Sequence, residues 1–319
     1  MNSLSEIADI IKANHSFGVT YHVSPDGDAC GSVMALVQGL RKLGKEAYII
    51  SRDLTPDNLG FLPLSMEIAG HNTKPKNNSD ILIALDCGNE ERLSCDISDF
   101  TGMIINVDHH ITNDMYGRFN YVDSSSSATS EIIYSLLNEL DIELDTSIAK
   151  CLYTGILTDT GSFRHSNTTS STHRVVSNLL NYNINHTKIH SALFDNKPFS
   201  KLKLIGRVLD DCKLLFNGKL ILLYVTKQML NELNIDNMDT GDLVSYGLQV
   251  ENTEVSVLLK ETDCGVKVSL RSKNEFDVRN IAEKFGGGGH IKASGITFND
   301  CTLSEVKDKI LNEFAKELD

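Results

Sequence analysis

The sequence predicts an α/β protein: a doubly wound, mostly parallel sheet in an N-terminal domain, followed by a smaller mixed α/β C-terminal domain. Strand-like runs alternate with helical patterns through the first half of the chain, as is typical of a doubly wound sheet. The runs "DILIALD" (80–86) and "GMIINVD" (102–108) are apolar almost throughout, as in parallel strands covered on both faces. A length of 319 residues suits about two domains.

The elements of the first half follow in order. Residues 1–17 have the spacing of an amphipathic helix, and "GVTYHV" (18–23) is the first β-rich run. Apolar residues at helical spacing over 30–44, with a stop at Gly44, predict the next helix. Further strands are expected over 46–51, 80–86 and 102–108, and further helices over 128–140, 146–157 and 170–182.

The pattern changes after residue 183. It is irregular over 183–200, and a helix over 200–212 is expected to bridge to a second unit. There, strands are predicted at 219–225, 254–261 and 265–272, with "TDCG" (262–265) as a hairpin turn, and helices at 278–285 and 303–317. We expect a domain over 1–185, a linker with a bridging helix over 186–215, and a domain over 216–319.

Composition and charge argue against several classes of function. The formal net charge of −13 argues against a broad basic face that holds long duplex nucleic acid. A short anionic substrate stays compatible, because a bound metal supplies local positive charge. We find neither a signal peptide nor a run of about 18 apolar residues, so we expect no membrane association and a cytoplasmic location. Seven scattered cysteines without a C-x-x-C pair disfavour a disulfide framework and a thiolate zinc site.

Acidic and imidazole side chains follow the predicted strands. Because the carboxyl ends of parallel strands share one edge of a sheet, these side chains are expected to meet there. Each motif alone also fits an ordinary polar turn, but their joint placement favours a shared site. The residues are His22, Asp26 and Asp28 after the first strand, Asp86 after 80–86, Asp108, His109 and His110 after 102–108, and Asp159 where a helix ends.

These residue types indicate a metal site. Carboxylates and imidazoles without thiolates suit Mn²⁺ or Mg²⁺, and imidazole favours Mn²⁺. There are more carboxylates than one ion needs, which predicts two ions and one bridging carboxylate. Clustered carboxylates repel each other unless cations lie between them. Two ions can activate a water and clamp a phosphoryl group, so phosphate ester hydrolysis is the favoured reaction.

The second domain contains the glycine run "FGGGGHIKASG" (285–295). Glycines leave no side chain to block a close approach, and a loop of this kind can offer its amides to phosphate oxygens. Alone, the run would be a hinge. Together with His290, Lys292, Ser294 and the nearby Arg271, it predicts a pocket for a phosphate-bearing substrate. No "GK[ST]" follows, so the run is not a Walker loop.

The motifs "HVSPDGDACGS", "LDCG", "DHH", "TDTGSF" and "FGGGGHIKASG" occur in this order over almost the whole chain. They resemble the DHH phosphoesterase family with its DHH-associated C-terminal domain, in particular the nanoRNase/pAp phosphatase subgroup. Family II inorganic pyrophosphatases share the metal motifs, but their second domain has a basic motif that is not found here. The resemblance implies that 1–185 is the catalytic domain and 216–319 the substrate-binding domain.

The resemblance also implies residue roles. Asp108 would orient an imidazole, and His110 would contact the scissile phosphate or assist the leaving oxygen. One Mn²⁺ would be held by His22, Asp26 and Asp86, and the other by Asp28, Asp86, His109 and Asp159, with Mg²⁺ or Co²⁺ as substitutes. Arg271, Gly288, Gly289 and His290, with Lys292 near them, would hold the terminal nucleotide or its phosphate.

The implied substrates are short single-stranded RNA, 3′-phosphoadenosine 5′-phosphate (pAp) and dinucleotides. The alternatives are a phosphodiesterase devoted to linear pApA or cyclic di-AMP, and a non-catalytic nucleotide-binding regulator. The family implies a homodimer. Arg164 either reaches phosphate or is a surface arginine, and the run 124–131 resembles a helix N-terminus that is capped or binds phosphate.

Overall fold

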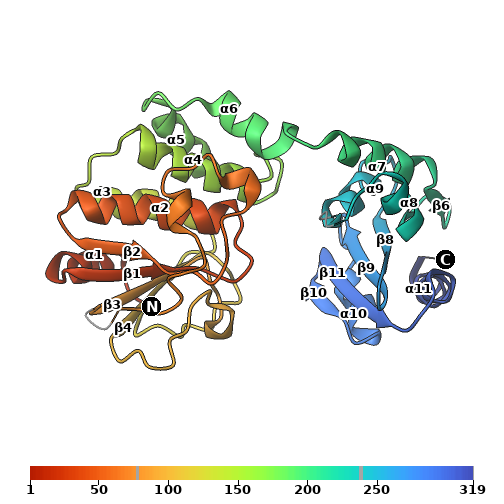
Figure 1. Cartoon of the computed structure of the whole chain (residues 1–319), viewed down its shortest axis with the longest axis horizontal. Helices are drawn as coiled ribbons and strands as arrows, with labels where there is room; N and C mark the ends of the chain where they lie inside the picture. The colour runs from red at the N-terminus through yellow and green to blue at the C-terminus, as the bar shows by residue number, and fades with distance from the viewer. Residues whose placement is uncertain (77–78, 237–239, 319) are drawn as a thin grey trace. The chain divides into compact units, whose positions relative to one another are not determined.

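The computed structural model describes residues 1–76, 79–236 and 240–318. The chain divides into two compact units, Met1–Asn196 and Lys197–Asp319 (Figure 1). The linker expected over 186–215 spans this division, because α6 (His186–His190) lies in the first unit and α7 (Phe199–Asp210) in the second. Each unit has its own hydrophobic core.

A five-stranded sheet forms the centre of the first unit. Its order is β2-β1-β3-β4-β5, and every neighbouring pair is parallel. The predicted class is therefore confirmed for this unit. The four residues of β5 escaped prediction because the run is short and contains a polar asparagine. The strands are β1 (Ser16–Thr20), β2 (Glu46–Ile49), β3 (Ile81–Leu85), β4 (Met103–Asp108) and β5 (Phe119–Val122).

The strand order reverses between β1 and β3. From β1 the chain moves to β2 on one side, and β3, β4 and β5 follow on the other side. At such a reversal the connections leave neighbouring strand ends in opposite directions, which opens a crevice at the carboxyl edge. The segments after β1, β3 and β4 carry the candidate metal ligands of this unit except Asp159, which ends α4 (Thr146–Asp159).

Helices cover one face of this sheet (Figure 1). The helix α2 (Gly27–Lys42) packs on β1, β2 and β3. It is buried on nearly all sides, because α3 (Thr129–Glu139) and α4 (Thr146–Asp159) cover the side that faces away from the sheet. The opposite face is covered by the segment after β3, where Leu93 and Cys95 pack with Tyr48 and Leu82. The helices are α1 (Leu4–Ala13), α2 (Gly27–Lys42), α3 (Thr129–Glu139), α4 (Thr146–Asp159) and α5 (Ser170–Leu180).

The second unit is built on a six-stranded mixed sheet of order β10-β11-β9-β8-β7-β6. Among the described strands of this second sheet, only β7 and β8 pair in parallel, which confirms a mixed second domain. The predicted hairpin at "TDCG" joins β8 to β9. The strands are β6 (Lys213–Leu215), β7 (Leu220–Val225), β8 (Val255–Thr262), β9 (Gly265–Ser272), β10 (Gly288–His290) and β11 (Ala293–Asn299).

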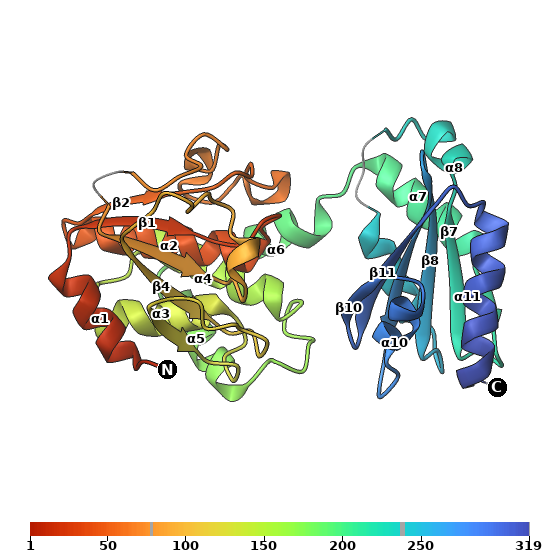
Figure 2. The same ribbon diagram turned by 90° about the horizontal axis from the view of Figure 1, so that it is seen from below.

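Helices cover the two faces of this sheet unequally. On one face, α10 (Val278–Lys284) and α11 (Leu303–Leu318) pack against the strands through residues such as Ile281 and Phe314 (Figure 2). On the other face, α7, α8 (Lys227–Glu232) and α9 (Val244–Gly247) pack mainly over β7 and β8. Among the described helices, none is both long and apolar enough to cross a bilayer.

The glycine run differs from the expected loop. Gly288–His290 forms β10, which pairs antiparallel with β11, and β11 pairs with β9. Glycine has a low strand propensity, so the sequence pattern did not show this ladder. The amides of 288–290 therefore belong to a sheet edge and not to an open phosphate-binding loop.

Candidate metal centre

The segment after β1 supplies two carboxylates through the start of a helix. Asp26 is the N-cap of α2, and its Oδ1 accepts hydrogen bonds from the amides of Asp28 (3.0 Å) and Ala29 (3.1 Å). The helix expected from residue 30 therefore begins at Gly27, and Asp28 lies in its first turn and not in a preceding loop. An acidic side chain is stabilised there by the partial positive charge of the helix N-terminus.

Asp28 is held by the start of α3. Its side chain is buried, and its Oδ2 accepts a hydrogen bond from the amide of Thr129 (2.6 Å). Its Oδ1 accepts from the amide of Ser130 (2.9 Å) and the hydroxyl of Ser32 (3.2 Å). The run 124–131 thus ends in a helix N-terminus whose amides bind a carboxylate of the protein itself.

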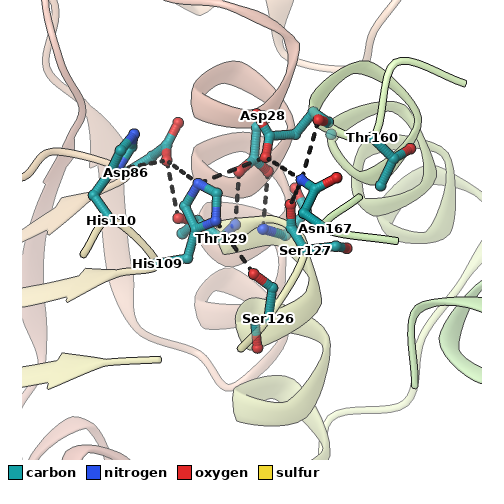
Figure 3. A network of polar contacts seen from close by, with 12 residues as sticks. Asp28, Asp86, His109, His110, Ser126, Ser127, Thr129, Thr160 and Asn167 are labelled. Atoms are coloured by element: carbon teal, nitrogen blue, oxygen red, sulfur yellow. Dashed lines mark hydrogen bonds and ion pairs between the residues drawn. The ribbon is translucent and has the colours of Figure 1, made fainter. Parts of the chain in front are cut away.

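Asp86 directly follows β3 and lies near three imidazoles, two of which, those of His109 and His110, are labelled in Figure 3. Its backbone has a φ of +53°, which is uncommon for a residue with a side chain. Its Oδ2 is 3.6 Å from Nε2 of His22, and its Oδ1 is 3.6 Å from Nε2 of His109 and 3.8 Å from Nδ1 of His110. The hydroxyl of Thr129 also donates to Oδ1 (3.0 Å). The two oxygens of one carboxylate therefore face different histidines.

Main-chain carbonyls fix the rings of two of these histidines. His22 Nδ1 donates to the carbonyl of Val23 (2.9 Å), and His109 Nδ1 donates to the carbonyl of Ser126 (3.3 Å; Figure 3). In this tautomer Nε2 carries no proton. The lone pairs on Nε2 are then available for a metal on the side of Asp86.

Asp159, the last residue of α4, brings a further carboxylate to the cluster. Its Oδ2 lies 3.7 Å from His109 Nε2. Asn167 Nδ2 donates to the carbonyl of Asp159 (3.2 Å), to Asp159 Oδ2 (3.4 Å) and to the carbonyl of Ser127 (2.9 Å). Asn167 therefore ties the end of α4 to the segment before α3.

His110 and Asp108 form a separate pair. Asp108 is fully buried, and its Oδ1 accepts from His110 Nδ1 (2.7 Å) and from the amide of His109 (2.8 Å). Its Oδ2 accepts from Asn113 Nδ2 (2.6 Å). Because Nδ1 of His110 is committed to Asp108, its Nε2 is the nitrogen left for a substrate.

Two sets of ligand atoms could each hold an ion. Within a set, one ligand atom from each residue lies within 4.8 Å of the others. Ligands about 2.1 Å from one ion lie roughly 3–3.6 Å apart, close to the 3.6 and 3.7 Å contacts of His109 with Asp86 and Asp159. The oxygen and nitrogen donors suit Mn²⁺ or Mg²⁺. The sets are His22, Asp26 and Asp86, and Asp28, His109 and Asp159.

A third set, Asp86 with His109 and His110, also satisfies the distance criterion. We favour the first two sets, because Nδ1 is the atom of His110 near Asp86 and it already donates to Asp108. The predicted metal residues thus lie together at the carboxyl edge of the first sheet. Asp86 lies within reach of both favoured sets, since its second oxygen faces His109.

Without bound cations, burial and mutual repulsion disfavour the ionised forms of Asp28 and Asp159. Burial raises the pKa of Asp28 well above its ordinary value, and the charges of Asp86 and Asp159 raise it further. Burial also raises the pKa of Asp159 to about 6. Burial opposes ionisation of Asp86, yet its pKa is lowered because three imidazoles favour the anion. The hydrogen bond to Asp108 raises the pKa of His110 to about 9.

Close packing of α4 on α2 and α3 brings these groups together. A Cβ at Gly155 would collide with Ser130 Oγ and lie 2.7 Å from Asp28 Oδ1. Only hydrogen fits at this position. Gly155 therefore lets α4 approach the amides that hold Asp28.

The candidate substrate residues of the second unit lie on neighbouring strands. His290 on β10 is paired with Ala293 on β11, and Ala293 is paired with Arg271 on β9. Gly288 and Gly289 precede His290 on β10. Burial lowers the pKa of Arg271, and no carboxylate of the described residues forms an ion pair with its guanidinium. An anionic ligand would compensate this half-buried charge.

Main-chain carbonyls engage the other two predicted cations. Lys292 donates to the carbonyls of Asn274 and Phe276. Arg164 is exposed after α4, and its Nε donates to the carbonyl of Gly161 (2.9 Å). Neither forms a described contact with the metal-ligand cluster.

The residues that hold the ligand cluster in place were not assigned these roles by sequence reasoning. Three of them lie in the run 124–131, which was expected to be a helix N-terminus that is capped or binds phosphate. The other two are asparagines that follow the predicted ligand motifs and act through their side-chain amides. No local pattern reveals these contacts. The residues are Asn113, Ser126, Thr129, Ser130 and Asn167.

Comparison with known proteins decides the family. The model of the DHH family N-terminal domain matches residues 16–156, and that of the DHHA1 domain matches residues 217–319. A Thermus thermophilus protein named bifunctional oligoribonuclease and PAP phosphatase NrnA is 36% identical over 313 residues, which cover 98% of this chain and 93% of that protein. The chain belongs to the DHH family. A Bacillus subtilis protein of the same name is 30% identical over 277 residues, 86% of each chain.

Solved structures show the same fold. A crystal structure of an exopolyphosphatase-related protein from Bacteroides fragilis matches with a TM-score of 0.89 and 27% identity, covering 99% of this chain and 97% of that chain. RecJ from Thermus thermophilus in complex with Mn²⁺ matches with a TM-score of 0.57 and 13% identity, covering 98% of this chain and 55% of that chain. At that identity the likeness to RecJ shows the DHH fold alone.

Proposed function

We propose that this DHH protein hydrolyses short oligoribonucleotides to mononucleotides and dephosphorylates pAp to AMP, using two divalent cations. The observation that carries the proposal is the position of Asp86. Each of its oxygens faces a different histidine at 3.6 Å, as a carboxylate shared by two ions requires.

The protein is a hydrolase of the DHH family. Its family membership supports this class, and so do the relatives from Thermus thermophilus and Bacillus subtilis, whose names describe oligoribonuclease and PAP phosphatase activities. The ligand cluster provides the chemistry that such hydrolysis needs.

We assign one ion to His22, Asp26 and Asp86, and the other to Asp28, Asp86, His109 and Asp159. Imidazole among the ligands favours Mn²⁺, with Mg²⁺ or Co²⁺ as substitutes. When bound, the cations supply an activated water and neutralise charge on the phosphoryl oxygens. The tautomers fixed by Val23 and Ser126 present Nε2 of His22 and His109 to the ions.

His110 acts on the substrate, and the buried Asp108 positions its ring. The hydrogen bond to Asp108 orients the ring and, in the metal-free protein, raises its pKa to about 9, which favours the imidazolium. An imidazolium can hydrogen-bond a phosphoryl oxygen or give a proton to the leaving oxygen. Asn113 holds the other oxygen of Asp108 and so limits its rotation.

In the second unit, Arg271, Gly288, Gly289 and His290 bind the terminal nucleotide or its phosphate. The half-buried guanidinium of Arg271 lacks an ion-pair partner among the described residues, which supports an anionic ligand. Lys292 and Arg164 have weaker support, because both side chains are exposed and water can solvate their charges. The net charge of −13 favours short substrates over long duplex nucleic acid. A cytoplasmic location and a homodimer are further parts of the proposal.

The test compares rates on pAp, linear pApA and a ribotrinucleotide with purified protein and Mn²⁺. We expect turnover of pAp and the trinucleotide, and a steep fall in rate for longer chains. Preference for pApA over both would instead indicate a dinucleotide phosphodiesterase. Stable binding of all three without product would indicate a nucleotide-binding regulator and overturn the proposal.

A further inference from the structure

One face of α7 presents large apolar side chains to solvent. Phe199 is 72% exposed, Leu202 is 52% exposed and Leu209 is 38% exposed. The opposite face of the helix is buried, because Leu204 and Val208 belong to a hydrophobic core of the second unit. Single exposed apolar residues are common on protein surfaces, but three on one helix face indicate a surface that binds a partner.

Gly206 lies at the centre of this exposed face. The three apolar residues are seven and four positions before it and three positions after it, which are the spacings of residues on one helix face. A Cβ at Gly206 would meet no atom of the described residues within 4 Å, so packing within one chain does not require glycine here. Glycine inside a helix is destabilising relative to alanine. The distance between two packed helices depends on the side chains at their contact, so a glycine at this centre lets a second helix approach closely.

Two residues of opposite charge also lie on this face. Lys203 is three positions before Gly206, and Asp210 is four positions after it. At 3.6 residues per turn, Lys203 and Asp210 lie on one side of Gly206, whereas Leu202 and Leu209 lie on its other side. Neither charge forms an ion pair within the part of the chain that the structure describes. The face therefore has an apolar side and a charged side, and the charged side contains one cation and one anion.

This arrangement is complementary to itself in an antiparallel pair of helices. When two copies of α7 face each other across a two-fold axis at Gly206, each side of the face meets the same side of the second copy. The rise of 1.5 Å per residue then places Lys203 within about 1.5 Å, along the helix axis, of Asp210 of the second copy. Leu202 meets Leu209 of the second copy in the same way. In a parallel pair the charged side would instead face the two leucines, which would bury the charges without a partner.

We propose that the exposed face of α7 binds a second copy of this chain, with the two helices antiparallel and Gly206 at their crossing. The inference rests on the homodimer of the proposed function, to which it adds a surface, and it does not depend on the proposed activity. The 12 residues of α7 span about 18 Å. Two facing helices of this length bury less than the roughly 1,200–2,000 Å² of a stable interface. We therefore expect a weak dimer that forms at high protein concentration.

Charge reversal tests the antiparallel pairing. Sedimentation velocity of the full chain from about 1 µM to about 1 mM measures its association. Lys203→Asp and Asp210→Lys each place like charges across the two-fold axis, so each should weaken association about tenfold or more. An equimolar mixture of the two variants should regain the wild-type association, because every charge then meets one of opposite sign. Lys188→Asp on α6, an exposed lysine away from this face, is the matched control and should associate as the wild type does.

The apolar side is tested by Leu202→Asp, which should abolish association while the unfolding temperature stays at the wild-type value, because Leu202 is exposed in the single chain. A wild type that is monomeric at every concentration overturns the dimer. A dimer that persists in both charge variants, or a mixture that fails to associate, overturns α7 as its surface. The activity is tested separately by cleavage of pAp with Mn²⁺, because α7 contains none of the residues assigned to catalysis or substrate binding.

Discussion

The fully buried carboxylate of Asp108 accepts a 2.7 Å hydrogen bond from Nδ1 of His110, whose ring is partly exposed. This contact raises the pKa of His110 to about 9 and turns its Nε2 away from Asp108. The same contact distinguishes His110 from His22 and His109. The Nδ1 atoms of those two histidines donate to main-chain carbonyls, which leaves their Nε2 atoms for a metal. Neighbouring histidines of one motif are thereby given different chemical roles.

His110→Asn is expected to lower kcat by about 10²- to 10⁴-fold, the range of a lost general acid. Binding of Mn²⁺ should stay at the wild-type stoichiometry, because His110 belongs to neither favoured ligand set. Kinetics on pAp and metal analysis of the dialysed protein check this. Loss of one ion in the variant would show that the third set, with Asp86 and His109, holds metal instead.

Asp86→Asn is expected to remove at least one of the two ions and to abolish turnover, because the carboxylate faces both ligand sets. The amide keeps the shape of the side chain but loses the charge shared by the ions. Calorimetric titration with Mn²⁺ measures the stoichiometry. Asp80→Asn is the matched control, since Asp80 is exposed just before β3, at the opposite end of that strand. Full activity in Asp86→Asn would contradict the two-ion arrangement.

Without metal, stability is expected to fall as pH rises from about 4 to about 9. Asp159 has a pKa of about 6 against an ordinary 3.8, and the pKa of Asp28 is also raised. In the lower part of this range the folded protein therefore binds more protons than the unfolded chain, and stability is lost as pH rises. His110 stabilises fully below its ordinary 6.5 and loses this contribution as pH rises through about 9. Asp86, with a lowered pKa, acts in the opposite direction only at more acidic pH.

Unfolding temperatures measured from pH 5 to pH 9, with chelator and with Mn²⁺, check this prediction. Mn²⁺ should stabilise more as pH rises, because it requires deprotonated ligands. Asp159→Asn should flatten the acidic part of the metal-free curve. A metal-free protein that becomes more stable between pH 5 and pH 7 would contradict the raised carboxyl pKa values.

Gly155→Ala is expected to destabilise the protein by about 1–3 kcal/mol, the usual range for overpacking. The added methyl group would collide with Ser130 Oγ and press on Asp28, so Mn²⁺ affinity should fall as well. Urea unfolding and Mn²⁺ titration measure both effects. Gly206→Ala adds the same group at an open helix position, so it should not destabilise the protein and should leave Mn²⁺ affinity unchanged. Wild-type metal affinity in Gly155→Ala would show that α4 can move without disturbing Asp28.

The sequence by itself determined where the parallel strands end and which side chains at those ends can bind a metal. Apolar runs that end in Asp86 and Asp108 place those carboxylates at the carboxyl ends of parallel strands, because strand direction is set by the alternation with helices. The motifs also indicated the family, which the comparisons confirm, and the residue types predicted a divalent cation. These properties depend on local pattern and on side-chain chemistry, both of which are written in the chain.

Only the tertiary structure decided how the ligands are held. The amides of Thr129 and Ser130 reach Asp28 from about a hundred positions away in sequence, and Asp86 takes a φ of +53° that its residue type does not predict. Likewise, Gly288–His290 becomes a strand only through pairing with β11. Backbone hydrogen bonds between distant segments are independent of side-chain identity, so no local pattern could have revealed them.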